Sequence, residues 1–229
     1  MGKHVEVKIL NAFVDNERGG NPAGVVLEGD HYTDNEKASI AEKVGLSETA
    51  FVSKSKIADF KLDFFTPNRR IADCGHATIA TFSYLVQSGL LNGEVSSKEI
   101  LDGRREIVLK GDMAFMEQLR PTYVSVGPRT RQFLDSLGLQ QEHLPGSAPI
   151  EIVNTGNAFA IIPVKTLDDL RLVKPDFDAV SKMSDEFDLI GYYVFSEQTN
   201  TAGRDASTRM FAPRYGILEE AGTGMAAGP

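Results

Sequence analysis

The side chains of this chain that are best suited to chemistry stand at two places. Cys74 and His76 flank a glycine where an apolar, helix-like pattern begins, and Glu48 lies in an earlier extended segment. A helix N-terminus presents unsatisfied backbone N–H groups and a positive dipole end, which favour a bound anion and lower the pKa of a thiol. The segment around Cys74 therefore predicts an anion site, although isolated side chains of these types also occur as packing residues.

Glu48 occupies an unusual position for a charged residue. Alternation over residues 46–52 places it in one row with Leu46, Ala50 and Val52. A carboxylate in such a row either faces water at an edge or is partly buried, where desolvation raises its pKa toward the range of a general base. The pattern leaves both interpretations open.

A second, weaker copy of the Cys74 segment occurs near the end of the chain. Residues 65–80 (FTPNRRIADCGHATIA) match residues 211–226 (FAPRYGILEEAGTGMA), 146 positions later, and residues 20–26 are matched by residues 156–162. A period of this length indicates duplicated lobes rather than a solenoid array. We expect two lobes and a cleft into which both helix starts direct N–H donors. Such a cleft is suited to bind a carboxylate-bearing ligand.

Composition limits the class of partner. The 229 residues include 24 Lys and Arg against 32 Asp and Glu, a net charge of −8 that disfavours a general nucleic-acid or anionic-membrane surface. The apolar runs are short and the first residues (MGKHVEVKIL) lack a cleavable hydrophobic region, so we expect neither membrane spanning nor export. The single cysteine, Cys74, predicts no internal disulfide and a cytoplasmic location.

Nothing in the spacing of ligand-type residues predicts a metal site. There is one cysteine, and the four histidines, His4, His31, His76 and His143, lack HxxH or HExxH spacing. The segment GTGMAAG has the spacing GxGxxxG, which differs from that of a dinucleotide loop.

Local patterns predict the main elements. Thr33 and Glu36 form a capping box for a helix that ends at Gly45, and Asp73 suits the N-cap of a buried helix that ends at Gly89. We place the lobe boundary near Arg120, giving lobes 1–120 and 121–229. In the second lobe we expect strands at 150–154, 159–164 and 191–196, and helices at 130–137, 167–173 and 177–184. Because 7 residues follow Gly222, too few for a second buried helix, we also expect a C-terminal truncation.

On these residues the chain resembles the PhzF-like family, named after the phenazine biosynthesis isomerase, within the diaminopimelate epimerase-like fold. The segments GNPAGVV, SETAFV and CGHAT carry the resemblance, and NAFVDNERGG, EIVNTGNAFAIIPV and FAPRYGILEEAGTGMA extend it along nearly the whole chain. The resemblance implies an α+β fold of two pseudo-symmetric lobes, each a curved, mostly antiparallel sheet wrapped around a central helix. It also implies an active site between the lobes, a homodimer, and no metal or organic cofactor.

The resemblance also implies roles for particular residues. Glu48 corresponds to the general acid/base, and His76 to a residue that binds substrate and assists proton transfer. Glu220 occupies the place of a further catalytic acid. The implied substrate-binding residues are Cys74, Gly75, Gly222, Thr223, Gly224 and Met225.

Three residues depart from the family pattern EDPxTGSA, which here reads EEAGTGMA. Glu220 replaces Asp, Ala221 replaces Pro and Met225 replaces Ser. One extra methylene displaces a carboxyl by about 1 Å, which costs roughly 10²-fold in rate where geometry is critical. Related epimerases use two facing cysteines, and Cys74 matches the first while the second has no counterpart.

Three hypotheses follow. The leading one is a cofactor-independent isomerase that shifts a proton within a small carboxylated substrate through Glu48. The alternatives are a non-catalytic binding protein on the same scaffold and an atypical amino-acid epimerase that uses Cys74 as a base.

Overall fold

The structure is a computed structural model that describes residues 4–16, 18–111, 113–146 and 148–228. The chain divides into two compact units, Met1–Gln118 and Leu119–Pro229. The boundary expected from the sequence, between residues 120 and 121, lies two residues further along the chain.

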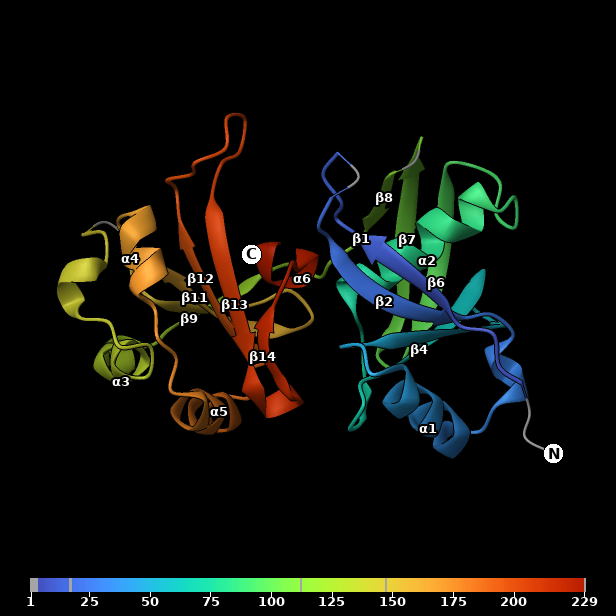
Figure 1. Cartoon of the computed structure of the whole chain (residues 1–229), viewed down its shortest axis with the longest axis horizontal. Helices are drawn as coiled ribbons and strands as arrows, with labels where there is room; N and C mark the ends of the chain where they lie inside the picture. Colours follow the sequence, from blue (N-terminus) through green and yellow to red (C-terminus); the bar gives the residue numbers. More distant parts are fainter. Residues whose placement is uncertain (1–3, 17, 112, 147, 229) are drawn as a thin grey trace. The chain divides into compact units, whose positions relative to one another are not determined.

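Unit 1 is a curled sheet with two helices (Figure 1). Its strands are β1 (Lys8–Ala12), β2 (Asn21–Val26), β3 (Thr49–Ser53), β4 (Phe60–Phe65), β5 (Arg70–Ile71), β6 (Val95–Ile100), β7 (Gly103–Lys110) and β8 (Met113–Met116). They hydrogen-bond in the order β1-β2-β3-β4-β6-β7-β8, and β5 pairs with β4. Helix α1 (Asp34–Val44) connects β2 to β3, and helix α2 (Gly75–Gln87) connects β5 to β6.

Unit 2 is a smaller sheet with short helices. Its strands are β9 (Thr122–Ser125), β10 (Glu151–Asn154), β11 (Ala158–Pro163), β12 (Gly191–Ser196), β13 (Ser207–Ala212) and β14 (Ile217–Glu220), and their order in the sheet is β14-β13-β12-β11-β10-β9. Its helices are α3 (Thr130–Asp135), α4 (Leu167–Leu172), α5 (Phe177–Glu186) and α6 (Gly224–Ala227).

The two units repeat one pairing scheme. In unit 1, β1 and β2 are antiparallel, β2 and β3 parallel, and β3, β4 and β5 successively antiparallel. In unit 2, β10 to β14 follow the same sequence of orientations. The residues before α2 and α6 also share one conformation, with φ −145° and ψ 119° at Cys74 and φ −143° and ψ 119° at Thr223. The internal match in the sequence therefore corresponds to a repeated topology.

Local sequence explains the ends of α1. The Thr33 hydroxyl accepts a hydrogen bond from the Glu36 N–H at 3.3 Å, and the Glu36 carboxylate accepts one from the Thr33 N–H at 2.8 Å. This is the predicted capping box, which satisfies two free donors of the first turn. The helix ends at Gly45, whose φ of 69° lies in the left-handed region that glycine adopts without a steric penalty.

Helix α2 is the central element of unit 1 and packs against the inner face of the curled sheet (Figure 1). Its side chains Ala77, Ala80, Phe82 and Leu85 join the hydrophobic core that the strands form. A helix that is apolar on nearly all sides requires such an enclosed position.

The predicted α+β class with curled, mostly antiparallel sheets is confirmed. Some details differ from the expectation. In the second copy, the offset of 146 aligns Ala221 with Gly75, the first residue of α2, but α6 begins at Gly224, three residues later. Strand β6 had no counterpart among the predicted elements, although it pairs with both β4 and β7.

Candidate functional site

Glu48 is placed by the parallel pairing of β2 and β3. Its carbonyl oxygen accepts a hydrogen bond from the Gly24 N–H at 3.0 Å. Glu48 is the residue immediately before β3, which begins at Thr49. Glu48 is 5% exposed. Of the two interpretations of its place in an apolar row, a carboxylate facing water or a buried one, the structure has the buried one.

The start of α2 places Cys74 and His76. Cys74 is the N-cap residue and is buried, and His76 lies in the first helical turn. The prediction that Asp73 is the N-cap was wrong by one residue. Its carboxylate accepts hydrogen bonds from the Cys74 N–H at 2.7 Å and from the Lys98 ammonium group, because that buried cation requires a negative partner.

The structure brings three of the predicted site residues together. The Cys74 Sγ lies 3.5 Å from His76 Nδ1, and His76 Nε2 lies 3.4 Å from Glu48 Oε2. The imidazole therefore stands between the thiol and the carboxyl group, with one ring nitrogen toward each. We call Glu48, Cys74 and His76 the buried trio.

His76 is a neutral imidazole near pH 7. Burial lowers its pKa to about 4, and a hydrogen bond with the Pro22 backbone opposes this change. The 3.4 Å contact with Glu48 consequently joins a carboxyl group to a neutral ring rather than to a cation. A neutral imidazole has one N–H donor and one acceptor nitrogen, so it can pass a proton in either direction.

The lowered pKa of His76 predicts a pH-dependent stability. An unfolded histidine has a pKa of about 6.5, so between that pH and about 4 the unfolded chain binds a proton that the folded chain does not. The free energy of unfolding should therefore fall by roughly 3 kcal/mol as the pH decreases through this window. Urea unfolding followed at a series of pH values measures this slope.

His76→Gln should remove that slope, because glutamine does not titrate. His31→Gln, at an exposed position on the same unit, is the matched control and should keep it. Equal slopes in the native chain and in His76→Gln would contradict a neutral buried imidazole.

The residue types of the buried trio also bind zinc. Among the residues that the structure describes, these three form the group whose donor atoms come close enough together for that role, all within 4.8 Å. The two shortest contacts use opposite nitrogens of one imidazole, so the thiol and the carboxyl group each approach their own ring nitrogen. This alignment suits proton transfer through the ring, and the absence of a metal site stays a prediction. Sequence spacing did not indicate the trio because Glu48 comes from the segment before β3, whereas Cys74 and His76 belong to the start of α2.

The remaining predicted site residues belong to unit 2 and surround the start of α6. Glu220 is the last residue of β14 and is half-buried, and Thr223 caps α6 with its hydroxyl group. Gly222 and Gly224 are half-buried on either side of Thr223, and Met225 is buried. Their roles in binding or catalysis stay predictions.

Lys98 is a further candidate that the sequence analysis missed. It is completely buried in β6, with its ammonium group at the start of α2. A signal was present, since Lys98 alternates with Ser96 and Ile100 on the inward face of the strand.

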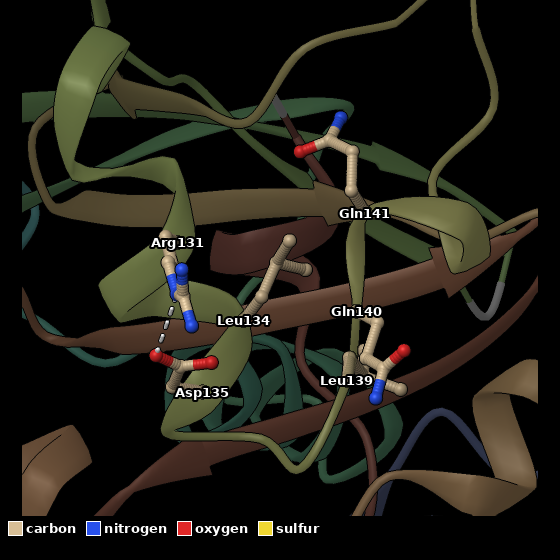
Figure 2. A pocket seen from close by; sticks show the side chains of 6 residues that line it. All are labelled: Arg131, Leu134, Asp135, Leu139, Gln140 and Gln141. Carbon is tan, nitrogen blue, oxygen red and sulfur yellow. Dashed lines mark ion pairs between the residues drawn. The ribbon is translucent and has the colours of Figure 1, made fainter.

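A pocket of about 440 Å³ in unit 2 is a weaker candidate for the functional site (Figure 2). It is lined by Arg131, Leu134, Asp135, Leu139, Gln140 and Gln141. Its ion pair, Arg131 with Asp135 at 3.6 Å, has side chains that are 90% and 65% exposed, so water screens both charges. The buried trio is the better site for proton chemistry.

Comparison with solved structures defines the class of fold. A hydroxyproline epimerase from Agrobacterium vitis aligns with a TM-score of 0.55 and 12% identity, covering 94% of this chain and 72% of that chain. At this identity the match shows the fold alone, which is the racemase and epimerase-like fold.

The chain belongs to the PhzC-PhzF family of phenazine biosynthesis-like proteins, whose model matches residues 10–229. A PhzF-family protein from Bacillus anthracis aligns with a TM-score of 0.88 and 31% identity over 98% of this chain and 77% of that chain. Uncharacterized isomerase YfhB of Bacillus subtilis (strain 168) is 34% identical over 99% of this chain and 79% of the relative. Trans-2,3-dihydro-3-hydroxyanthranilate isomerase of Pseudomonas fluorescens is 30% identical over 96% of this chain and 76% of the relative.

The family match and the names of these relatives show that the chain is an enzyme of an isomerase family. Of the helices that the structure describes, none combines the length and the apolar character needed to cross a bilayer.

Proposed function

We propose that the chain is an isomerase that moves a proton within a small carboxylated substrate, with Glu48 as the general acid/base. One observation carries the proposal: a buried carboxyl group lies 3.4 Å from a buried, neutral imidazole. General acid/base groups are often found in this kind of desolvated setting close to a second titratable group.

In this mechanism the Glu48 carboxylate takes a proton from one carbon of the substrate. The electron pair of the broken C–H bond delocalises into the unsaturated system, and the neutral carboxyl group then returns a proton to a different carbon. No atom is gained or lost, so the product is an isomer. His76 lies 3.4 Å from this carboxyl group and is the neighbouring group that exchanges a proton with it in the proposed mechanism.

The N-terminus of α2 supports the binding part of the proposal. Gly75 and His76 lie in the first turn of this 13-residue helix, where the dipole is positive and favours a substrate carboxylate. The family resemblance also implies Glu220 and the segment Gly222–Met225 in substrate binding and proton transfer, and these roles stay part of the proposal. The replacement of a family serine by the buried Met225 indicates a different substrate contact there.

A direct test uses the compound in the name of the Pseudomonas fluorescens relative. Trans-2,3-dihydro-3-hydroxyanthranilate carries a carboxylate, and its isomerisation by the chain can be followed by NMR. If it is unchanged, a panel of other unsaturated carboxylic acids follows. A folded chain that isomerises none of them would contradict the proposal.

A second candidate function is favoured by the position of Cys74. Its Sγ lies 3.5 Å from His76 Nδ1, the geometry in which an imidazole can accept a thiol proton, so Cys74 is the alternative base of an epimerase.

Cys74→Ser separates the two candidates. With Glu48 as the acid/base, we expect Cys74→Ser to keep turnover within roughly tenfold of the native chain, because serine preserves the N-cap position. A thiol base predicts a loss of about 10²-fold or more. Initial rates of the two proteins under the same conditions decide between them.

The homodimer implied by the family resemblance also stays a proposal. Sedimentation velocity of the purified chain measures it directly.

A further inference from the structure

Lys98 places a cation inside the core of unit 1. The residue is 0% exposed. It donates to Asp73 Oδ1, to the Thr78 hydroxyl at 2.8 Å and to the Met116 sulfur at 3.0 Å, and it lies 5.4 Å from the centre of the Phe64 ring. Burial lowers the pKa of Lys98, and the negative charges of Asp73 and of a Cys74 thiolate oppose this change.

Both oxygen partners of Lys98 also hold the backbone of Cys74. The Asp73 carboxylate accepts the Cys74 N–H at 2.7 Å, and the Thr78 hydroxyl donates to the Cys74 carbonyl oxygen at 2.6 Å. The Thr78 N–H donates to the same oxygen at 3.1 Å. Lys98 therefore contacts both side chains, Asp73 and Thr78, that hold the backbone of Cys74, the N-cap residue of α2.

We propose that Lys98 is a positioning residue that, through Asp73 and Thr78, fixes Cys74 and the first turn of α2 and supplies the positive charge beside the thiol. Because His76 follows two residues later in the same turn, the geometry of the buried trio depends on this arrangement. The link to turnover rests on the proposed function, whereas the tests below are titrations of the folded protein and do not require a substrate.

Stability alone does not account for this lysine. Replacing a buried ion pair by apolar side chains of similar volume is often neutral or stabilising, so the pairing of Lys98 with Asp73 is weak evidence for a role in stability. The cation has a chemical consequence instead, because a positive charge favours a thiolate. The other charged or titratable groups that face this region are Asp73, His76, Glu48 and Arg105.

The single cysteine makes the first test unambiguous, since the ¹³Cβ chemical shift of labelled cysteine then reports the ionisation of Cys74 alone. In Lys98→Met, which has a similar length and no charge, the midpoint of the thiol titration should rise by about one pH unit or more. Lys98→Arg should restore a midpoint near that of the native chain, because it restores the cation. A purely structural role of the lysine predicts no such dependence on charge.

Lys37→Met is the matched control. Lys37 is also a buried lysine of unit 1, but it lies in α1, and it pairs with Asp63 of β4 at 2.5 Å and lies over the Phe51 ring of β3. Its loss should destabilise the unit and leave the thiol midpoint unchanged. An unshifted midpoint in folded Lys98→Met, or an equal shift in Lys37→Met, would overturn the proposal.

The reciprocal measurement leaves the lysine in place and therefore applies even if Lys98→Met fails to fold. In Cys74→Ser the thiolate is absent, so the Lys98 ammonium group should lose its proton at a lower pH than in the native chain. NMR of the Lys98 Cε and Nζ signals follows this titration. Identical Lys98 titrations in the two proteins would refute a charge interaction between Lys98 and Cys74.

Discussion

Glu48→Gln lowers the rate of isomerisation by about 10²–10⁴-fold, the range that general acid/base groups contribute. Glutamine has nearly the shape of glutamate but cannot take up the substrate proton. Substrate binding should change little, because the carboxylate-binding helix start is intact. The measurement is a comparison of kcat and KM for the native and variant proteins with the substrate that the assay identifies.

The exposed Glu42 of α1 provides the matched control. Glu42→Gln removes one carboxylate from the same unit and should leave kcat within about twofold, as expected for a surface substitution. Turnover of Glu48→Gln at the native rate would rule out Glu48 as the acid/base. A rise in KM with an unchanged kcat would assign it to binding instead.

Asp63→Asn lowers the free energy of unfolding by roughly 3–5 kcal/mol, the cost of breaking a buried ion pair from one side. The Asp63 side chain is 3% exposed and accepts from Lys37 at 2.5 Å on one oxygen and from Arg70 on the other. Asparagine preserves the volume but leaves the Lys37 cation buried without a counter-charge, 5.8 Å from the centre of the Phe51 ring. Urea unfolding measures the loss.

The double variant Asp63→Asn with Lys37→Met is the control for this effect. Because it removes the stranded cation as well, it should be less destabilised than the sum of the two single variants. Additive losses would show that Asp63 and Lys37 do not interact.

The same pair has a defined pH dependence. Burial raises the pKa of Asp63, but the hydrogen bond and charge of Lys37, together with the charges of Arg70 and Lys61, outweigh burial and lower it below its usual value. A carboxylate with a lowered pKa stabilises the fold above the unfolded value, about pH 4, and this contribution is lost as the pH falls through the folded value. Asp63→Asn should therefore show a shallower loss of stability below about pH 4 than the native chain.

Much of the fold could be predicted because its signals are local or repeated. Thr33 and Glu36 stand three residues apart as a capping box requires, and Gly45 ends the helix where a left-handed residue is needed. The internal match extended this information to the topology, since both copies use the same sequence of strand orientations.

The parts that could not be predicted depend on tertiary contacts. Aspartate is a residue type that favours the N-cap position. The Asp73 carboxylate, however, accepts a hydrogen bond from Lys98, 25 residues later, and Cys74 is the N-cap residue. Strand β6 has the sequence VSSKEI, in which a charged and a polar residue face inward, and its alternation gave too weak a signal.

The candidate site was predicted residue by residue but not as an arrangement. Alternation placed Glu48 on an apolar row, and the helix start singled out Cys74 and His76. In the structure one imidazole lies between the thiol and the carboxyl group. This arrangement depends on the pairing of β2 with β3 and on the packing of α2, and a single sequence reports neither.

The most direct test of the central claim is the entry of deuterium from solvent into the product. In D₂O, the proton that Glu48 takes from the substrate exchanges before it is returned, so the product of the native chain should carry deuterium at the newly protonated carbon. Glu48→Gln should form deuterated product about 10²–10⁴-fold more slowly at the same enzyme concentration. Deuterium entry at the native rate in Glu48→Gln would contradict the account of Glu48 as the proton-transferring residue.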